Sequence, residues 1–517
     1  MNWKKILKYS LIVFIVLMFG AMTWLDNQGK LMYGGLTEVV DHQQFTPTSG
    51  PVVIRNVNVL APDGEQFIPD QSILVKQNEI VAIDSAVNYP SGATIIDGKG
   101  KYLIPGLIDA HVHLFKSPND LLLYIANGVT EIRELIGEED HLTWKKEIES
   151  GRIGPKMFVA SPRLGSFEMM EGWMMAKTQG FMNVPNGASA KEIVRELHDQ
   201  GYDGLKIYSH LNRESYLAVT KTAKELGMPV FGHIPFDIDY KDLWENGQSD
   251  IAHFEEIMNA LQREFGNYKG DEIKKHFGSF KGYEDEFLSF VEERSDDLAN
   301  KLIKHDISVT STLWLTQSFV RQKVELNKIL SEVELAYENP GLMEGNKITS
   351  RALGWLPEVN RYRFLDNVNN DQKVALEKYW NAYGQACQIL ARNLSQKGVK
   401  IMAGTDANLP VAVPGFSLHD ELISLNEAGL STSEVLRSAT TIPATWLKSN
   451  SGKIAVGYEA NMILLDKNPL VNISHTKTIN TVIAGGRIFD RSLIDRMLEA
   501  VKEANNNSRQ VHIHEFE

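Results

Sequence analysis

Six side chains that bind metal ions or move protons follow or end apolar runs in the middle of the sequence. They are His111, His113, Lys206, His233, His253 and Asp406. Because side chains alternate along a strand with a period of two, the imidazoles of an H-x-H pair such as His111 and His113 point to one face. Two imidazoles on one face suit a single metal ion. The whole set predicts a metal-dependent centre.

Lys206 is the member of this set that most needs an explanation. It lies inside the apolar run GLKIY, where an unpaired ammonium is costly to bury. Either burial lowers its pKa and the lysine serves as a base, or carbon dioxide converts it into a carbamate, which is a carboxylate able to bridge two cations. The residues alone leave both explanations open.

Eight apolar runs of strand length alternate with helical periodicity between residues 105 and 447. The runs are LIDAHVHL, VTEIRE, KMFVAS, GLKIYS, PVFGHI, DIAHFEEI, ISVTSTLW and KIMAGTDA. This order predicts an α/β protein with a (β/α)8 TIM barrel over residues 105–447. Active sites of such barrels lie at the carboxyl ends of the strands, which is where the six side chains fall.

Outside the eight predicted strands, the sequence predicts a second domain, two insertions and a C-terminal helix. Residues 50–104 and 452–489 show short strands and turn signals, which predict one small β-sandwich domain built from both ends of the chain. Two polar, helix-prone stretches, about 259–306 and 317–398, are expected as helical insertions over the barrel mouth. Residues 490–517 are expected to form a helix and a loose polar tail.

Residues 1–30 carry three lysines before an apolar run from Leu11 to about Leu25. This N-terminal hydrophobic helix is typical of a signal peptide or a transmembrane anchor. Because lysines stay on the cytoplasmic side, the catalytic domain is expected outside the cytoplasmic membrane, anchored to it or, if the signal is cleaved, secreted or periplasmic. No clean small-x-small cleavage site follows the run, so an uncleaved anchor is favoured.

Charge and cysteine content exclude several classes of protein. A net charge of −13 repels nucleic acid phosphates, so no nucleic acid partner is expected. The single cysteine, Cys387, rules out an internal disulfide and any metal site built on several thiolates. The metal ligands must therefore be nitrogen and oxygen atoms. Composition leaves the oligomeric state open, a homo-oligomer included.

The motifs PGLIDAHVHL, GLKIY, FGHIP, DIAHFEEI and AGTDA resemble the metal-binding motifs of the amidohydrolase superfamily. The resemblance runs from about Val52 to Phe489, where GKIAVGYEANMILLDKNPL is similar to the family's returning β-domain. With a lysine on its expected fourth strand, the sequence resembles the imidazolonepropionase-like and Xaa-Pro dipeptidase-like branch of these metal-dependent hydrolases. For this branch the resemblance implies that Lys206 is N6-carboxylated (a carboxylysine) and bridges two divalent metal ions.

The resemblance also implies roles for the other five side chains. His111 and His113 hold the first metal ion together with Asp406, and His233 and His253 hold the second. Zinc is the expected metal, because it accepts imidazole and oxygen ligands. Asp406 is expected to act as general base and then general acid for a hydroxide that bridges the two metal ions.

The implied activity is hydrolysis of a carbon–nitrogen bond in a small molecule, as an amide, cyclic amide or dipeptide. Tyr208 and His210, in the motif KIYSH, are expected to contact the substrate. Two alternatives remain at this stage. The same centre can hydrolyse an ester, lactone or phosphotriester, because activating water does not choose the leaving group. The chain can also be a catalytically inactive surface binding protein.

Overall fold

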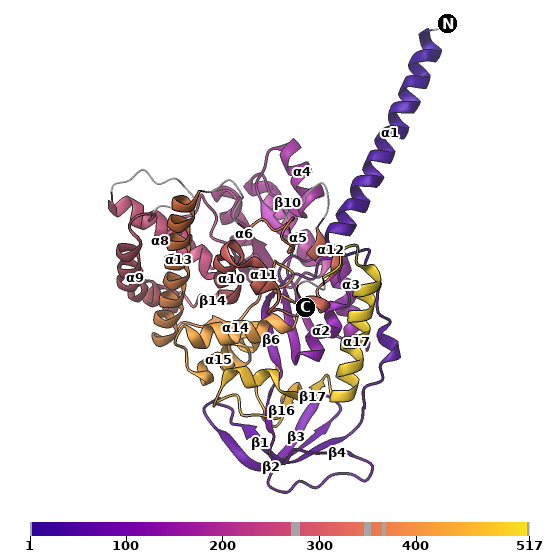
Figure 1. Ribbon diagram of the computed structural model, residues 1–517, viewed down its shortest axis with the longest axis vertical. Helices are drawn as coiled ribbons and strands as arrows, with labels where there is room; N and C mark the ends of the chain where they lie inside the picture. Colours follow the sequence, from indigo (N-terminus) through magenta and orange to yellow (C-terminus); the bar gives the residue numbers. More distant parts are fainter. Residues whose placement is uncertain (1–2, 270–279, 346–352, 364–368, 514–515, 517) are drawn as a thin grey trace.

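The computed structural model describes residues 3–269, 280–345, 353–363, 369–513 and 516. Its described strands form three sheets, two parallel and one largely antiparallel, and helices lie around the parallel strands (Figure 1). The mixed α/β class and the N-terminal apolar helix that the sequence predicts are both confirmed. Parts of the two predicted helical insertions fall outside the described residues.

The parallel strands lie in two sheets, and each of the eight predicted runs contains one of them. The first sheet contains β6 (Leu107–Val112), β7 (Val129–Glu134) and β8 (Lys156–Val159). The second contains β9 (Arg163–Gly165), β10 (Phe181–Asn183), β11 (Leu205–Ile207), β12 (Val230–Gly232), β13 (Asp250–Ala252), β14 (Ser308–Thr310) and β15 (Ile401–Met402). Strands such as β6 are buried along their whole length, as expected of parallel strands covered on both faces.

Backbone hydrogen bonds connect the two parallel sheets at two places. On one side Ser161 N donates to Gly204 O at 2.9 Å, next to a parallel bridge between Ala160 and Gly204. On the other side Ala110 N donates to Ala403 O, also at 2.9 Å. The carboxyl ends of β6, β11, β12, β13 and β15 are therefore brought to one end of the molecule.

Both ends of the chain contribute strands to the third sheet. Its members are β1 (Val52–Leu60), β2 (Phe67–Lys76), β3 (Glu79–Asp84), β4 (Thr94–Asp97), β5 (Tyr102–Pro105), β16 (Met462–Leu465), β17 (Ile479–Ala484) and β18 (Arg487–Asp490). The strands form one continuous sheet, so the predicted β-sandwich is not seen. The reason is that β1 pairs with β2 on one side and with β4 and β5 on the other.

Most helices follow the parallel strands. They are α2 (Asp120–Ala126), α3 (Glu139–Glu149), α4 (Met169–Gln179), α5 (Gly187–Gln200), α6 (Arg213–Leu226), α7 (Tyr240–Glu245), α8 (Phe254–Lys269), α9 (Glu284–Lys304), α10 (Leu313–Val324), α11 (Leu326–Leu330), α12 (Pro340–Glu344), α13 (Asn370–Gln396), α14 (Phe416–Glu427), α15 (Thr432–Ser438) and α16 (Thr441–Leu447). Local sequence sets their limits. For example, the Asn212 side chain caps the start of α6, and Gly227 ends it with a left-handed φ of 71°.

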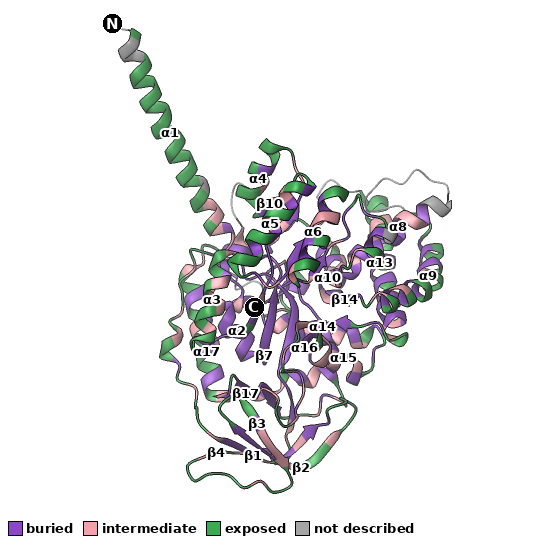
Figure 2. Cartoon of the chain, turned by 180° about the vertical axis from the view of Figure 1, so that it is seen from behind, coloured by how far each residue is buried: buried purple, intermediate pink, exposed green. Residues whose placement is uncertain are grey.

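Helix α1 (Trp3–Met32) projects away from the rest of the molecule (Figure 1). Among the described residues it is the helix long and apolar enough to cross a membrane, over Leu7–Met32. Its apolar part is exposed along its length (Figure 2).

The tail after α17 (Arg491–Ser508) differs from the loose tail that the sequence predicts. Ile513 and Phe516 are buried in an apolar cluster that includes Trp355 and Val411. The backbone N–H groups of the preceding residues donate to the carboxylate of Glu344. Burial of these two apolar residues and the hydrogen bonds to Glu344 attach the tail to the rest of the protein.

We expect the buried ion pair between Arg133 on β7 and Asp250 on β13, 2.6 Å long, to be required for stability. Asp250→Ala leaves a buried guanidinium uncompensated and should lower the free energy of unfolding by about 3–5 kcal/mol. Asp297→Ala, which removes an exposed pair with Lys301, should change it by less than about 1 kcal/mol. Denaturant unfolding measures both, and equal effects would contradict this role.

Candidate metal centre

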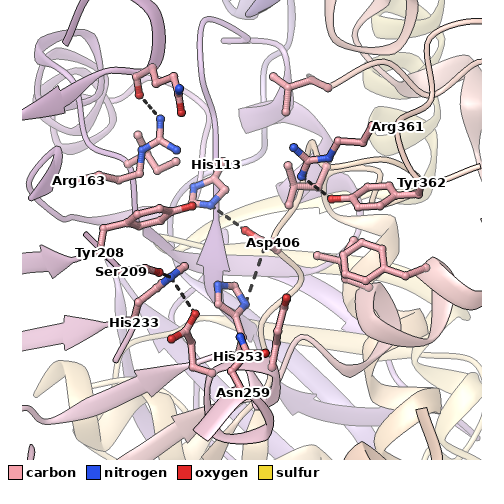
Figure 3. Close-up of a pocket in the computed structure, with 18 of the residues that line it drawn as sticks. His113, Arg163, Tyr208, Ser209, His233, His253, Asn259, Arg361, Tyr362 and Asp406 are labelled. Carbon is pink, nitrogen blue, oxygen red and sulfur yellow. Dashed lines mark hydrogen bonds and ion pairs between the residues drawn. The ribbon is translucent and has the colours of Figure 1, made fainter. Parts of the chain in front are cut away.

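A cavity of about 930 Å³ opens at the carboxyl ends of the parallel strands. Five of the six predicted side chains line it, and they are His113, Lys206, His233, His253 and Asp406. Figure 3 labels His113, His233, His253 and Asp406. The sixth, His111, lies behind them and is fully buried. The structure thus brings together side chains from five strands that are far apart in sequence.

His111, His253 and Asp406 each offer one ligand atom, and these atoms lie within 4.8 Å of one another. Neither ring nitrogen of His111 has a hydrogen-bond partner among the described residues, although its Nε2 lies 3.2 Å from Asp406 Oδ1. Burial lowers the pKa of His111 and lowers that of His253 to about 3. Both imidazoles are therefore neutral, which is the form that binds metal ions.

The Asp406 carboxylate is held among imidazoles. His113 Nε2 lies 2.7 Å from Asp406 Oδ1, and His253 Nδ1 lies 3.9 Å from Oδ2. Burial opposes ionisation of this carboxyl, but the two histidines outweigh burial and hold its pKa below the usual range. Asp406 is therefore an anion at neutral pH and can bind a cation or accept a proton.

Lys206 is buried, and its Nζ has no hydrogen-bond partner in the described part of the chain. Burial lowers the pKa of this lysine to about 8, although Asp406 partly opposes the shift. In about one of ten protein molecules the Lys206 side chain is then a neutral amine at pH 7. An unpaired amine at this depth is an unusual group that a ligand or a modification would satisfy.

His233 is oriented by three neighbours. Its Nδ1 lies 2.7 Å from the Ser209 hydroxyl and 3.0 Å from Glu256 Oε1. The Tyr208 ring stacks on the imidazole with 4.0 Å between ring centroids. With Nδ1 engaged, Nε2 is the nitrogen left to act as a ligand, as is common for histidines at metal sites.

Two of the site residues adopt a backbone conformation that non-glycine residues rarely use. His253 has φ 72° and Asp406 has φ 56°, in the left-handed region that costs of order 1–3 kcal/mol each. The backbone of Asp406 is held there by a 2.8 Å hydrogen bond from its N to His111 O. Such strain is typical of functional positions.

Segments of the chain match curated proteins. An adenine deaminase of Chelativorans sp. (strain BNC1) is 26% identical over 208 residues, which is 35% of this chain and 32% of that protein. An L-hydantoinase of Paenarthrobacter aurescens is 33% identical over 63 residues, covering 12% and 13% of the two chains. The chain thus spans a third or less of the length of these relatives.

Similarity to solved structures extends further along the chain. A bottromycin amidohydrolase has a TM-score of 0.65 at 20% identity, covering 92% of this chain and 96% of that one. An Xaa-Pro dipeptidase with bound methionine in its active site has a TM-score of 0.58 at 18% identity, covering 85% and 100%. At these identities the likeness shows a common fold.

The model of the amidohydrolase family matches residues 332–489, which include Asp406 and the strands β16 to β18. This segment belongs to the amidohydrolase family. The superfamily resemblance inferred from the strand-end motifs is therefore confirmed.

The two residues expected to contact the substrate lie in different surroundings. Tyr208 lines the cavity, whereas His210 is exposed, lies between Phe167 and Phe236 and is not among the lining residues. Arg133 and Glu134, at the end of β7, have separate partners: Arg133 pairs with Asp250, and the Glu134 carboxylate lies 3.8 Å from the His113 imidazole.

Several residues that line the cavity were not predicted from the sequence. They include Arg163, Lys323, Arg361 and Tyr362. A usable signal existed for Arg163, which comes four residues after β8 and so near a strand's carboxyl end. The other three belong to the long insertion, where no periodic pattern distinguishes a lining residue from a surface one.

We expect Gly404→Ala to disturb the centre, because a Cβ at this position lies 2.7 Å from His111 Cβ and 2.7 Å from Thr310 Cγ2. The variant should bind less metal per purified chain than the wild type. Gly384→Ala is the matched control, since its Cβ meets no atom closer than 4.0 Å. Elemental analysis measures the metal, and an unchanged content in Gly404→Ala would contradict the tight packing behind His111.

Proposed function

We propose that this protein is a metal-dependent hydrolase that cleaves a carbon–nitrogen bond. The observation that carries the proposal is a cavity lined by three imidazoles, a carboxylate and a lysine without a hydrogen-bond partner among the described residues, with the His111 imidazole buried behind them. The names of the relatives agree with it, because deaminases, a hydantoinase and a dipeptidase all act on such bonds.

We interpret the eight strands β6, β7, β8, β11, β12, β13, β14 and β15 as one closed (β/α)8 barrel. Support comes from the hydrogen bonds at Gly204 and Ala403, which link the two parallel sheets in the strand order such a barrel requires. In this interpretation residues 105–447 form the metal-binding barrel, and 50–104 with 452–489 form the small composite β-domain.

We assign His111, His113 and Asp406 to a first divalent metal ion and His233 and His253 to a second, and the closeness of His253 to His111 and Asp406 supports placing the two ions side by side. When bound, such ions lower the pKa of water and polarise the group under attack. Nitrogen and oxygen donors suit zinc. The buried orphan nitrogens of His111 support this fit, since buried polar atoms without a partner are rare.

Lys206 fits the bridging role once carboxylated. Its neutral amine adds to carbon dioxide, a C–N bond forms, and one proton leaves the nitrogen. The product is an anionic carbamate that removes the cost of an unpaired ammonium at this site. The buried side chain without a hydrogen-bond partner supports this proposal over a simple base.

Asp406 is the residue placed to move the proton. Its lowered pKa keeps the carboxyl group ionised, which is the form that can accept a proton from the attacking water. The same oxygen then delivers that proton to the leaving nitrogen, so the residue acts first as base and then as acid. Tyr208, stacked on His233, lies beside the path of the substrate.

Two arginines in a cavity that Glu255 and Glu256 also line offer positions for an acidic group of the substrate. Arg163 and Arg361 lie on opposite sides of the cavity in Figure 3, and both line it. A guanidinium binds a carboxylate through paired hydrogen bonds, so an N-acyl amino acid or a dipeptide fits the cavity better than neutral adenine. This is the observation that separates the proposal from deamination of a nucleobase.

We expect purified, metal-loaded full-length protein to hydrolyse N-acyl amino acids or dipeptides in a panel that also contains hydantoin, a lactone and adenine. Asp406→Asn should lower kcat on the accepted substrate by about 10²–10⁴-fold, because it removes the proton acceptor. Released amine measures the reaction. Turnover of only the lactone, or of only adenine, would overturn the assignment.

Lys206→Ala should abolish both activity and the binding of two metal ions per chain. Protein stripped with a chelator should recover two ions only when bicarbonate accompanies the metal, and labelled bicarbonate should give a carbon-13 carbamate signal. Lys323→Ala is a matched control, because burial also lowers the pKa of that cavity lysine to about 8. Two ions in Lys206→Ala, or a label lost in Lys323→Ala, would refute the bridging role.

A further inference from the structure

The end of the apolar helix α1 forms part of the cavity wall. Met32, its last residue, and Tyr33 both line the cavity. Tyr33 is fixed to the body of the protein, because its ring lies 5.1 Å from that of Phe115 and its O accepts a 2.9 Å hydrogen bond from Lys116 N. The helix is continuous from Trp3 to Met32, so no linker separates the apolar segment from the cavity.

The short distance between the apolar segment and the cavity follows from helix geometry. The exposed apolar residues of α1 extend to Trp24. Nine residues then lead to Tyr33, which at 1.5 Å per residue is about 13 Å. If α1 spans a bilayer, the cavity wall at Tyr33 lies within the thickness of the headgroup layer and the first water layers beside it.

A second apolar surface lies next to this wall. Helix α4 exposes four large apolar side chains, Met169, Met170, Trp173 and Met174, with exposed fractions of 86%, 72%, 56% and 54%. Within α4, whose residues are all described, Gly172 is the one buried residue. Figures 1 and 2 show α4 at the end of the molecule from which α1 projects.

Helices α1 and α4 meet at the cavity. The Tyr33 hydroxyl donates a 3.1 Å hydrogen bond to Thr178 O near the end of α4. Thr178 and Gln179 line the cavity together with Met32 and Tyr33. The cavity wall on this side is thus built from the ends of the two helices that carry exposed apolar residues.

We propose that α4 inserts into the same bilayer that α1 spans, and that the cavity receives amphiphilic substrates directly from this membrane. Four exposed apolar side chains on one helix indicate a surface that is covered in use. Because α4 meets the end of the candidate membrane span α1 at the cavity, we identify the lipid bilayer as the partner that covers these side chains. Methionine and tryptophan suit the boundary between headgroups and acyl chains.

The substrate class follows from the cavity walls and rests on the proposed function. Apolar residues line much of the cavity, and they include Phe115, Ile136, Phe236, Leu315, Phe319 and Leu353. Arg163, on the α4 side, offers a guanidinium for an anionic group. We therefore expect a long-chain N-acyl amino acid, with its acyl chain among the apolar residues and its carboxylate at the arginine.

Quenching of tryptophan fluorescence tests the membrane surface without any substrate. Full-length protein is reconstituted in phosphatidylcholine vesicles with and without brominated acyl chains. Trp173→Phe should lose part of the quenching by brominated lipid, whereas Trp446→Phe, which removes a side chain packed over Arg133, should lose none. Equal quenching in the wild type and Trp173→Phe would overturn the insertion of α4.

Kinetics on two substrates tests the route of entry. The Met170→Glu/Trp173→Glu double variant should reduce kcat/KM for a vesicle-borne long-chain N-acyl amino acid at least tenfold relative to a water-soluble short-chain one. Val471→Glu, at a position 76% exposed outside both helices, should leave this ratio unchanged. An unchanged ratio in the double variant would overturn entry from the membrane.

The two measurements separate failure of this inference from failure of the proposed function. If wild-type protein hydrolyses neither substrate, the proposed hydrolase activity and the substrate class both fail, while quenching still decides whether α4 meets the membrane. If the soluble substrate is hydrolysed and Trp173 shows no quenching, the function holds and the membrane surface fails.

Discussion

The hydrogen bonds between β6 and the segment after β15 are the constraint on which the centre depends. Ala110 N donates to Ala403 O, and Asp406 N donates to His111 O at 2.8 Å. These bonds place a carboxylate beside two imidazoles that lie almost three hundred residues earlier in the sequence. They also hold Asp406 at a positive φ. Glycine is needed at position 404, because a side chain at this position would lie too close to His111.

The centre accepts buried polar groups that a purely structural core would avoid. Lys206 and His111 lack hydrogen-bond partners among the described residues, which costs stability. The surroundings offset part of this cost through charged groups that are paired, such as Arg133 with Asp250 and Glu256 with His233. A site that is incomplete without a ligand explains the imbalance better than a packing fault does.

The sequence was informative where a regular pattern repeats. Strands that are largely buried give apolar runs, and a polar residue that ends such a run is easy to notice, which is why the candidate ligands stood out in the sequence. Arg361 and Tyr362 could not, because their positions depend on how an irregular insertion folds over the cavity. The single sheet in place of a sandwich, and the buried Ile513 and Phe516, depend on long-range pairing that local pattern does not reveal.

The separation of His111 from Asp406 along the chain has a consequence for how the protein matures. Contacts between such distant residues form late, because a long loop must close before they gain any stability. The first ligand pair is synthesised well before its partner carboxylate, and the tail that packs against Val411 comes last of all. A growing chain therefore lacks the carboxylate of the candidate centre until residue 406 has been made, so a metal ion would find the full proposed set of ligands only after that point.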